Sequence, residues 1–85
     1  RLAHKEFIIG KFYLRRHAWV AAAGRFEGLL RSYPQSADRE LALAYLGQCQ
    51  AQLGDIEAAR ATLRKLDDEQ LNGRQVKELR KLIGP

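Results

Sequence analysis

The chain has 85 residues, which is enough for one small domain or for a piece of a larger one. Apolar residues make up 46% of it and charged residues 29%, which excludes a disordered chain and is typical of a folded globular one. No apolar run approaches the ~20 residues that a membrane span needs, and the single cysteine, Cys49, excludes an internal disulfide. Because the sequence begins at Arg1 and contains no methionine, we expect it to be part of a longer protein.

The net charge of +5 is concentrated in the first part of the chain. Residues 1–36 hold seven basic and two acidic residues, whereas residues 37–85 hold eight of each kind. This asymmetry predicts an acidic partner for the first part of the chain.

Five helices are predicted, and no stretch alternates as a strand would. The first runs from His4 to about Arg16. The second runs from Trp19 to Ser32, where apolar residues follow the i, i+3, i+4, i+7 spacing of one buried helix face. Pro34 stops this second helix.

Capping residues mark the starts of the other three helices. The expected N-caps of the third, fourth and fifth helices are Ser36, Asp55 and Asn72. The third helix should end near Leu53 before Gly54, and the fifth near Ile83. In the fifth helix, one face is expected to be buried, and it carries Val76, Leu79, Leu82 and Ile83.

The sequence repeats its landmarks with a period of 37 residues. The aligned pairs are Gly10 with Gly47, His17 with Gly54, Trp19 with Ile56, Ala22 with Ala59 and Phe26 with Leu63. These are positions where two antiparallel helices must touch, with small residues at the close crossing and large ones beside it. The first copy reads Ile9-Gly10-x-x-Tyr13, Ala22-x-x-x-Phe26 and then Pro34, which is the tetratricopeptide pattern.

These features predict an all-α fold, an α-solenoid of two tetratricopeptide-like helix pairs plus a C-terminal capping helix. The first pair is assigned to residues 1–36, the second to residues 37–71 and the capping helix to residues 72–85. The first helix is apolar on more than one side, as a helix packed against a preceding repeat would be. We therefore expect the end of a longer array, and partial self-association through the first helix.

Catalytic, metal and cofactor sites are not predicted. His4 and His17 are thirteen residues apart on one helix, too far along its axis to share a metal ion. No serine or cysteine has a base at a recognisable spacing, and Cys49 is expected to be a buried, unreactive thiol. We therefore expect a protein without enzyme activity.

Two surfaces compete as protein-binding sites. The first is the concave groove of the array, where the candidate contact residues are Lys11, Phe7 and Gln48. Lys11 is suited to a carboxylate or an extended peptide, but the third helix offers no basic residue to complete a clamp.

The second surface is the outer face of the second helix, where Ala21, Gly24 and Gly28 surround Arg25. Glycine inside a helix costs roughly 1 kcal/mol relative to alanine, so two glycines on an outer face need a reason. One interpretation is that a partner's backbone approaches closely while Arg25 binds a carboxylate with its forked donors. The other is that the glycines relieve crowding within the array. The supporting charges are Arg15, Arg16 and Arg31.

Two segments resemble the BamD family of outer-membrane lipoproteins, which belong to the machinery that assembles β-barrels. They are Phe12-Tyr13-Leu14-Arg15-Arg16-His17-Ala18-Trp19-Val20-Ala21-Ala22 and Arg25-Phe26-Glu27-Gly28-Leu29-Leu30-Arg31-Ser32-Tyr33-Pro34. The likeness covers roughly residues 4–66 and corresponds to the family's last two tetratricopeptide repeats. The segment after Leu71 has no clear counterpart.

The resemblance implies a scaffold on the periplasmic side of the outer membrane, tethered by a lipid on an N-terminal cysteine that this piece lacks. It also implies binding to the membrane-proximal periplasmic domain of the barrel subunit BamA, where the arginine that matches Arg25 pairs with an acidic residue. The expected function is therefore a non-enzymatic protein-binding scaffold.

Two alternatives remain. One is a tetratricopeptide module of another pathway that binds a peptide tail in its concave groove. The other is nucleic-acid binding through residues 1–36, which the scattered basic residues and the lack of a stacking platform disfavour, so no nucleic acid is expected as a partner.

Overall fold

In a computed structural model, which describes residues 2–84, the chain folds into five α-helices. These are α1 (Leu2–Arg15), α2 (Trp19–Ser32), α3 (Arg39–Gln52), α4 (Ile56–Asp68) and α5 (Arg74–Ile83). The described range contains no strand, which confirms the predicted all-α fold. Arg1 and Pro85, the first and last residues of the predicted array, lie outside the described residues.

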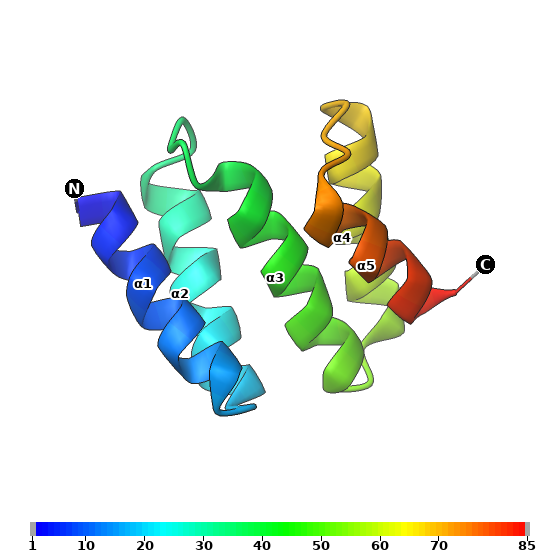
Figure 1. Ribbon diagram of the computed structural model, residues 1–85, viewed down its shortest axis with the longest axis horizontal. Coiled ribbons are helices and arrows are strands. Elements are labelled where there is room, and N and C mark those ends of the chain that lie inside the picture. The colour runs from blue at the N-terminus through cyan, green and yellow to red at the C-terminus, as the bar shows by residue number, and fades with distance from the viewer. Residues whose placement is uncertain (1, 85) are drawn as a thin grey trace.

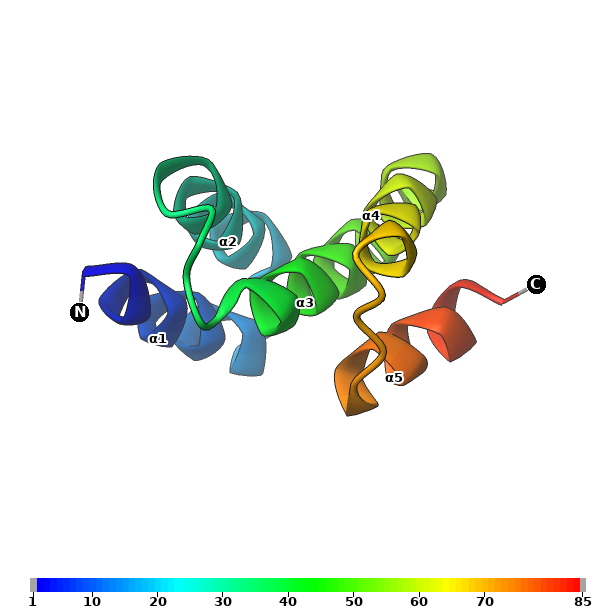
Figure 2. The same ribbon diagram turned by 90° about the horizontal axis from the view of Figure 1, so that it is seen from above.

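The helices form two antiparallel pairs and a fifth helix that packs on the second pair (Figure 1). α1 packs against α2, α3 packs against both α2 and α4, and α5 packs against α3 and α4. Figure 2 shows α2 and α4 on one side of α3 and α1 and α5 on the other. This is the alternation of inner and outer helices that characterises a helical-repeat solenoid.

The two connections within the helix pairs have the same backbone geometry. His17, between α1 and α2, has a φ of 59°, and Gly54, between α3 and α4, has a φ of 84°. Both residues are in the left-handed region, which glycine adopts without strain and histidine only at a cost. The ring of His17 stacks on Trp19 with 4.8 Å between ring centroids. The 37-residue repeat therefore extends to the backbone conformation of its turns.

One of the three predicted N-caps is confirmed and two are wrong. The Asp55 carboxylate accepts a hydrogen bond from the Ala58 N–H at 3.2 Å and caps α4. Ser36 instead accepts from the Asp38 N–H at 3.0 Å within a turn, so α3 begins only after Asp38. The fifth helix begins after Gly73 and not after Asn72.

A tertiary hydrogen bond explains the start of α5. The Gly73 N–H donates to Glu40 Oε2 on α3 at 2.7 Å. A carboxylate from a neighbouring helix thus does what the side chain of Asn72 was expected to do, namely accept a hydrogen bond at the start of α5. No pattern local to the last helix could reveal this.

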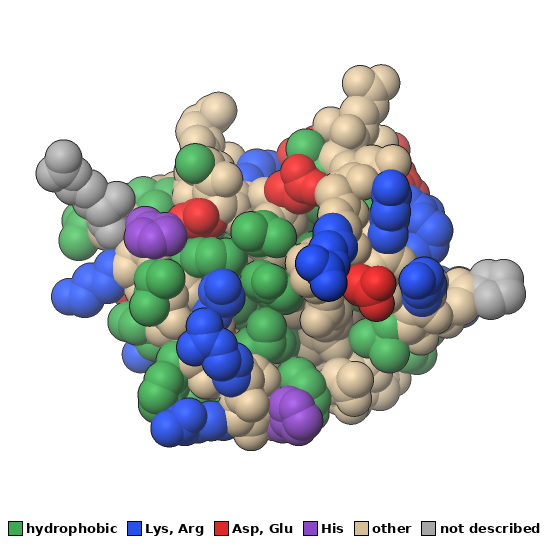
Figure 3. All heavy atoms as spheres, viewed as in Figure 1, with side chains coloured by type: hydrophobic (Ala, Val, Ile, Leu, Met, Phe, Trp, Pro, Cys, Tyr) green, Lys and Arg blue, Asp and Glu red, His purple; other side chains and the backbone are tan. Residues whose placement is uncertain are grey.

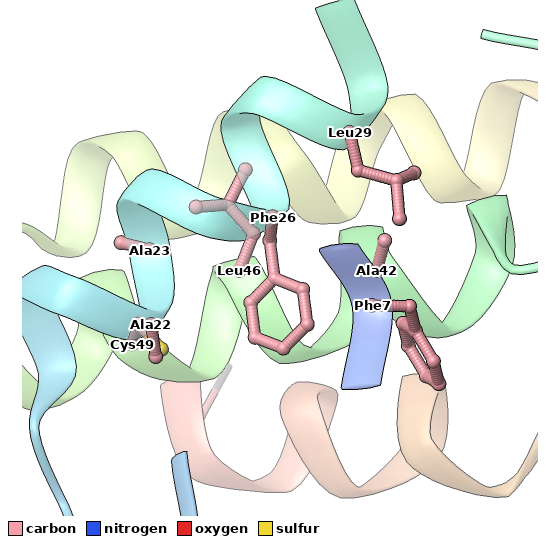
Figure 4. Close-up of a cluster of buried hydrophobic side chains, with 8 residues drawn as sticks. All are labelled: Phe7, Ala22, Ala23, Phe26, Leu29, Ala42, Leu46 and Cys49. Atoms are coloured by element: carbon pink, nitrogen blue, oxygen red, sulfur yellow. The ribbon is translucent and has the colours of Figure 1, made fainter. Parts of the chain in front are cut away.

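The main core lies between α1, α2 and α3, and Phe26 is its largest fully buried side chain. Figure 4 shows Phe26 pointing from α2 into this cluster, close to Phe7 and Leu46. A Cβ atom added at Gly10 would lie 2.6 Å from Cε1 of Phe26, so the predicted close crossing of α1 and α2 is confirmed. Burial raises the pKa of the Cys49 thiol in this core to about 11, which keeps it protonated and unreactive, as expected.

A second core cluster joins α5 to α3 and α4. It contains Leu43, Ala44, Leu66, Val76 and Leu79. A Cβ atom added at Gly47 would lie 2.5 Å from a methyl group of Leu79, so Gly47 marks a close crossing of α3 with α5 and not the predicted one with α4. The prediction for Leu82 is wrong, because its side chain is 45% exposed at the outer end of α5.

Candidate protein-binding site

The outer face of α2 is open to solvent. Ala21, Gly24 and Arg25 are exposed, and Gly28 is half-buried. A Cβ atom added at Gly24 would have no neighbour within 4 Å, and one added at Gly28 would meet only the Arg31 guanidinium at 4.0 Å. Relief of crowding within residues 2–84 therefore does not explain these two glycines.

Arg25 forms an ion pair with Glu6 on α1. Its Nη1 donates to Glu6 Oε1 at 3.2 Å, and the two side chains are 44% and 36% exposed. An ion pair this exposed contributes about 0–1 kcal/mol to stability, because water competes for both charges. The Arg25 guanidinium is therefore oriented by Glu6 but is available to another carboxylate at little cost.

Glu6 is the residue of this site that sequence reasoning did not include. It takes the place that the tetratricopeptide pattern gives to tryptophan, so the substitution itself was visible in the sequence. Its pairing with Arg25 depends on how α1 and α2 are rotated against each other, and only the three-dimensional structure gives that rotation.

The supporting arginines differ in their surroundings. Arg31 lies on the same face as Arg25, since its guanidinium borders Gly28. Arg16 lies over the ring of Phe12 on α1, with its Cζ 4.0 Å from the ring centroid. Arg15 is exposed at the last residue of α1. Only Arg31 therefore borders the small-residue surface on α2.

The structure places the three groove candidates in three different environments. Phe7 is buried in the core, with its ring centroid 6.0 Å from that of Phe26, so its assignment to the groove surface is wrong. Lys11 is half-exposed, with its Nζ 5.6 Å from the centroid of the Phe7 ring. Gln48 is half-buried and donates through Nε2 to Gln75 of α5 at 3.0 Å.

Figure 3 shows the face that these candidates were expected to line. Hydrophobic side chains gather between α1 and α3, and basic side chains stand over α1 and α5. Phe7 is in the core, and Lys11 and Gln48 are both partly exposed. Because Gln48 is hydrogen-bonded to α5, Lys11 is the candidate of the three whose polar group makes no hydrogen bond to a described residue.

Residues 2–84 contain neither a cluster of metal-ligating side chains nor a long apolar helix. In that range no group of three or more His, Cys, Asp or Glu side chains is placed to hold a metal ion. None of the described helices combines the length and the apolar character that crossing a bilayer requires.

The paired helices, the glycine at the crossing of α1 and α2, and the alternation of inner and outer helices (Figure 2) define a helical-repeat protein of the tetratricopeptide type. Residues 1–66 match the YfiO family, described as an outer membrane lipoprotein. Since the match covers more than half of the sequence, the chain belongs to this family. α5 lies beyond the matched residues.

Relatives with a curated name point to the same family. The outer membrane protein assembly factor BamD of Xylella fastidiosa (strain 9a5c) is 51% identical over 53 residues, which cover 62% of this chain and 18% of the relative. The protein of the same name from Haemophilus influenzae is 35% identical over 66 residues, or 78% and 25% of the two chains. The one from Vibrio cholerae is 36% identical over 62 residues, or 73% and 26%.

The chain thus spans about a fifth to a quarter of the length of the curated relatives it matches. Among solved structures, none matches it at a significant level.

Proposed function

We propose that the chain is part of a non-enzymatic scaffold for the assembly of outer-membrane β-barrel proteins. The proposal is supported by its membership of a family described as an outer membrane lipoprotein and by relatives named as outer membrane protein assembly factors. The scaffold works on the periplasmic side of the outer membrane, held by a lipid anchor outside this piece.

The proposed partner is the membrane-proximal periplasmic domain of the barrel subunit BamA. The observation that carries this proposal is the outer face of α2, where the exposed Arg25 stands beside two glycines with open space above them. A partner's backbone would approach at Gly24 and Gly28, and a partner carboxylate would replace Glu6 on Arg25. Binding would then exchange one exposed ion pair for a better-shielded one.

Reversing the charge of Arg25 tests this contact. We expect Arg25→Glu to weaken binding to the periplasmic domains of BamA by at least about tenfold, because a desolvated charge pair at an interface becomes a repulsive one. Isothermal titration calorimetry measures the affinity, and circular dichroism checks that the helices are intact. The matched control is Arg60→Glu, which makes the same charge change at an exposed position of α4.

A second variant separates docking from a purely internal role of Arg25. If a partner carboxylate takes the place of Glu6, Glu6→Gln should leave the affinity unchanged or raise it slightly. If Arg25 only holds α1 against α2, Glu6→Gln should weaken binding as much as Arg25→Glu does. That second result, or equal losses for Arg25→Glu and Arg60→Glu, would contradict the proposed site.

The two glycines provide a prediction in which stability and binding change in opposite directions. Gly24→Ala and Gly28→Ala should each stabilise the isolated chain by roughly 0.5–1 kcal/mol, because alanine is the better helix former and the added methyl meets no close neighbour. The same methyl groups should lower the affinity for the partner, since they stand where its backbone approaches. Thermal unfolding and calorimetry measure the two effects.

Loss of stability in these alanine variants would show that the glycines serve the fold. A gain in stability with undiminished affinity would remove this face of α2 from the proposed interface.

A further inference from the structure

A groove runs between α2 and α4, and α3 forms its floor. Among the described helices, α2 and α4 do not contact each other, and Figure 2 shows them standing apart on the same side of α3. The space between them has a volume of about 610 Å³, within the range of sites that hold a small ligand or a few side chains. The groove does not include Arg25, so a ligand in it would be independent of the proposed contact with BamA.

The floor of this groove is apolar. Leu43 and Leu46 reach it from α3, where most of their surface is already buried, and Leu30 contributes a half-buried side chain from α2. The wall formed by α4 carries the small residues Ala58 and Ala61, which keep the groove wide. An aliphatic side chain placed here would lose its contact with water against this floor.

The rims of the groove carry an excess of positive charge. Arg31 on α2 and Lys65 on α4 stand on opposite walls, and neither has an ion-pair partner among residues 2–84. Arg39 also lines the groove, but its guanidinium is held by Glu69 through hydrogen bonds of 2.9 and 2.6 Å. Glu27 is the single acidic residue of the lining. Glu69, which holds Arg39, also attracts Lys65, so the groove keeps a modest excess of positive charge. This excess, on both sides of an apolar floor, favours a ligand that carries carboxylates.

A polar pair at the wall supplies hydrogen-bonding groups for a peptide backbone. Thr62 Oγ1 donates to Gln50 Oε1 at 2.7 Å. The amide nitrogen of Gln50 makes no hydrogen bond to another described residue and remains a donor for a carbonyl group. Backbone carbonyls are the acceptors that an extended segment offers at regular intervals.

We propose that this groove binds an extended segment of a partner protein in which an aliphatic side chain is flanked by carboxylates. In an extended segment, successive side chains point to opposite sides. An aliphatic residue can therefore face the floor of leucines while its acidic neighbours reach the rims at Arg31 and Lys65. The apolar floor provides affinity, and the two cations select an acidic segment over a basic one.

The test uses two synthetic probes on the whole 85-residue chain. One is a fluorescein-labelled peptide with the core Gly-Glu-Leu-Glu-Gly, and the other has lysine in place of each glutamate. We expect the acidic peptide to bind in fluorescence anisotropy, and to shift the backbone amide signals of α2 and α4 in ¹⁵N-edited spectra. The lysine peptide should bind at least tenfold more weakly.

Charge-reversal variants locate the site. Lys65→Glu should weaken binding of the acidic peptide at least tenfold. Arg60→Glu makes the same charge change on the same helix outside the groove and should alter it less than threefold. Ala61→Trp, which fills the groove without changing the charge, should also abolish binding while circular dichroism shows intact helices.

Three results would overturn the proposal. They are no binding of the acidic peptide, equal binding of both peptides, and equal losses in Lys65→Glu and Arg60→Glu. A fourth would do so as well: dimers in sedimentation that Lys65→Glu dissociates would show that a second copy of the chain occupies the groove.

Discussion

Phe26→Ala should destabilise the chain by about 3–5 kcal/mol, measured as the loss in free energy of unfolding in urea. Phe26 is 0% exposed and is the largest side chain of the core between α1, α2 and α3. Its ring centroid lies 6.0 Å from that of Phe7 and 5.8 Å from that of Tyr45, so its removal leaves a cavity among aromatic rings that cannot easily collapse. At about 0.05–0.15 kcal/mol per residue, the 85 residues have a total stability of about 4–13 kcal/mol, so this loss is a large fraction of it.

Two control variants keep this prediction testable even if Phe26→Ala fails to fold. Phe26→Leu should cost less, about 1–2 kcal/mol, because leucine stands at the aligned position Leu63 in the second helix pair. Phe12→Ala removes an aromatic ring that is 45% exposed on α1 and should cost much less than Phe26→Ala. Comparable losses for Phe12→Ala and Phe26→Ala would contradict the assignment of the core.

The close approach of Gly10 to Phe26 allows the packing of Phe26 to be tested in a second way, by a double-mutant cycle. Gly10→Ala alone should destabilise the chain by roughly 1–3 kcal/mol, because the added methyl would overlap a rigid ring. In the Phe26→Ala background the same methyl would enter the cavity. The double variant should therefore be more stable than the sum of the two single losses implies, and strict additivity would count against direct contact.

The features of the fold that were predictable from sequence are those set by local periodicity and by the repeat. Helical spacing predicted five helices and their order, and the repeat predicted the close crossing of α1 and α2 at Gly10. The aligned Gly47 lies against Leu79 of α5, a contact that the repeat does not contain. The errors occur where a distant residue decides the outcome. α5 begins after Gly73 because Glu40 on α3 accepts a hydrogen bond from its N–H, and no pattern in residues 72–85 contains that carboxylate.

The candidate site also has features that helical spacing predicts and features that depend on neighbouring helices. Helical spacing placed Gly24 and Arg25 opposite the buried stripe of α2. It could not decide their exposure, because an outer helix face can also pack within a longer array. The Glu6 partner and the groove between α2 and α4 depend on how neighbouring helices are rotated and spaced. The error at Phe7 has a related cause. Its side chain packs in one cluster with residues of both α2 and α3, and the pattern of a single helix does not specify which of its faces does so.

Leu79→Ala should cost about 2–5 kcal/mol and should release α5 before the other helices. Leu79 is 0% exposed, and its methyl groups reach the place where a side chain at Gly47 would stand. Besides this cluster, α5 is held by two partly buried hydrogen bonds to α3, at Gly73 and Gln75, and by exposed hydrogen bonds from Arg80 to Asp67. Water competes for both charges of an exposed pair like this one, so it cannot hold a ten-residue helix in place without its apolar anchor.

Native-state hydrogen exchange distinguishes release of α5 from uniform destabilisation. In Leu79→Ala the amides of α5 should lose protection, whereas those of α1 and α2 should retain theirs, because α5 does not contact either helix. Leu82→Ala is the matched control, since it removes the same side chain from an exposed position of the same helix and should change protection little. Equal loss of protection in α1 and α5 would show that the whole chain unfolds as one unit, and that α5 is an integral part of the solenoid and not a separable cap.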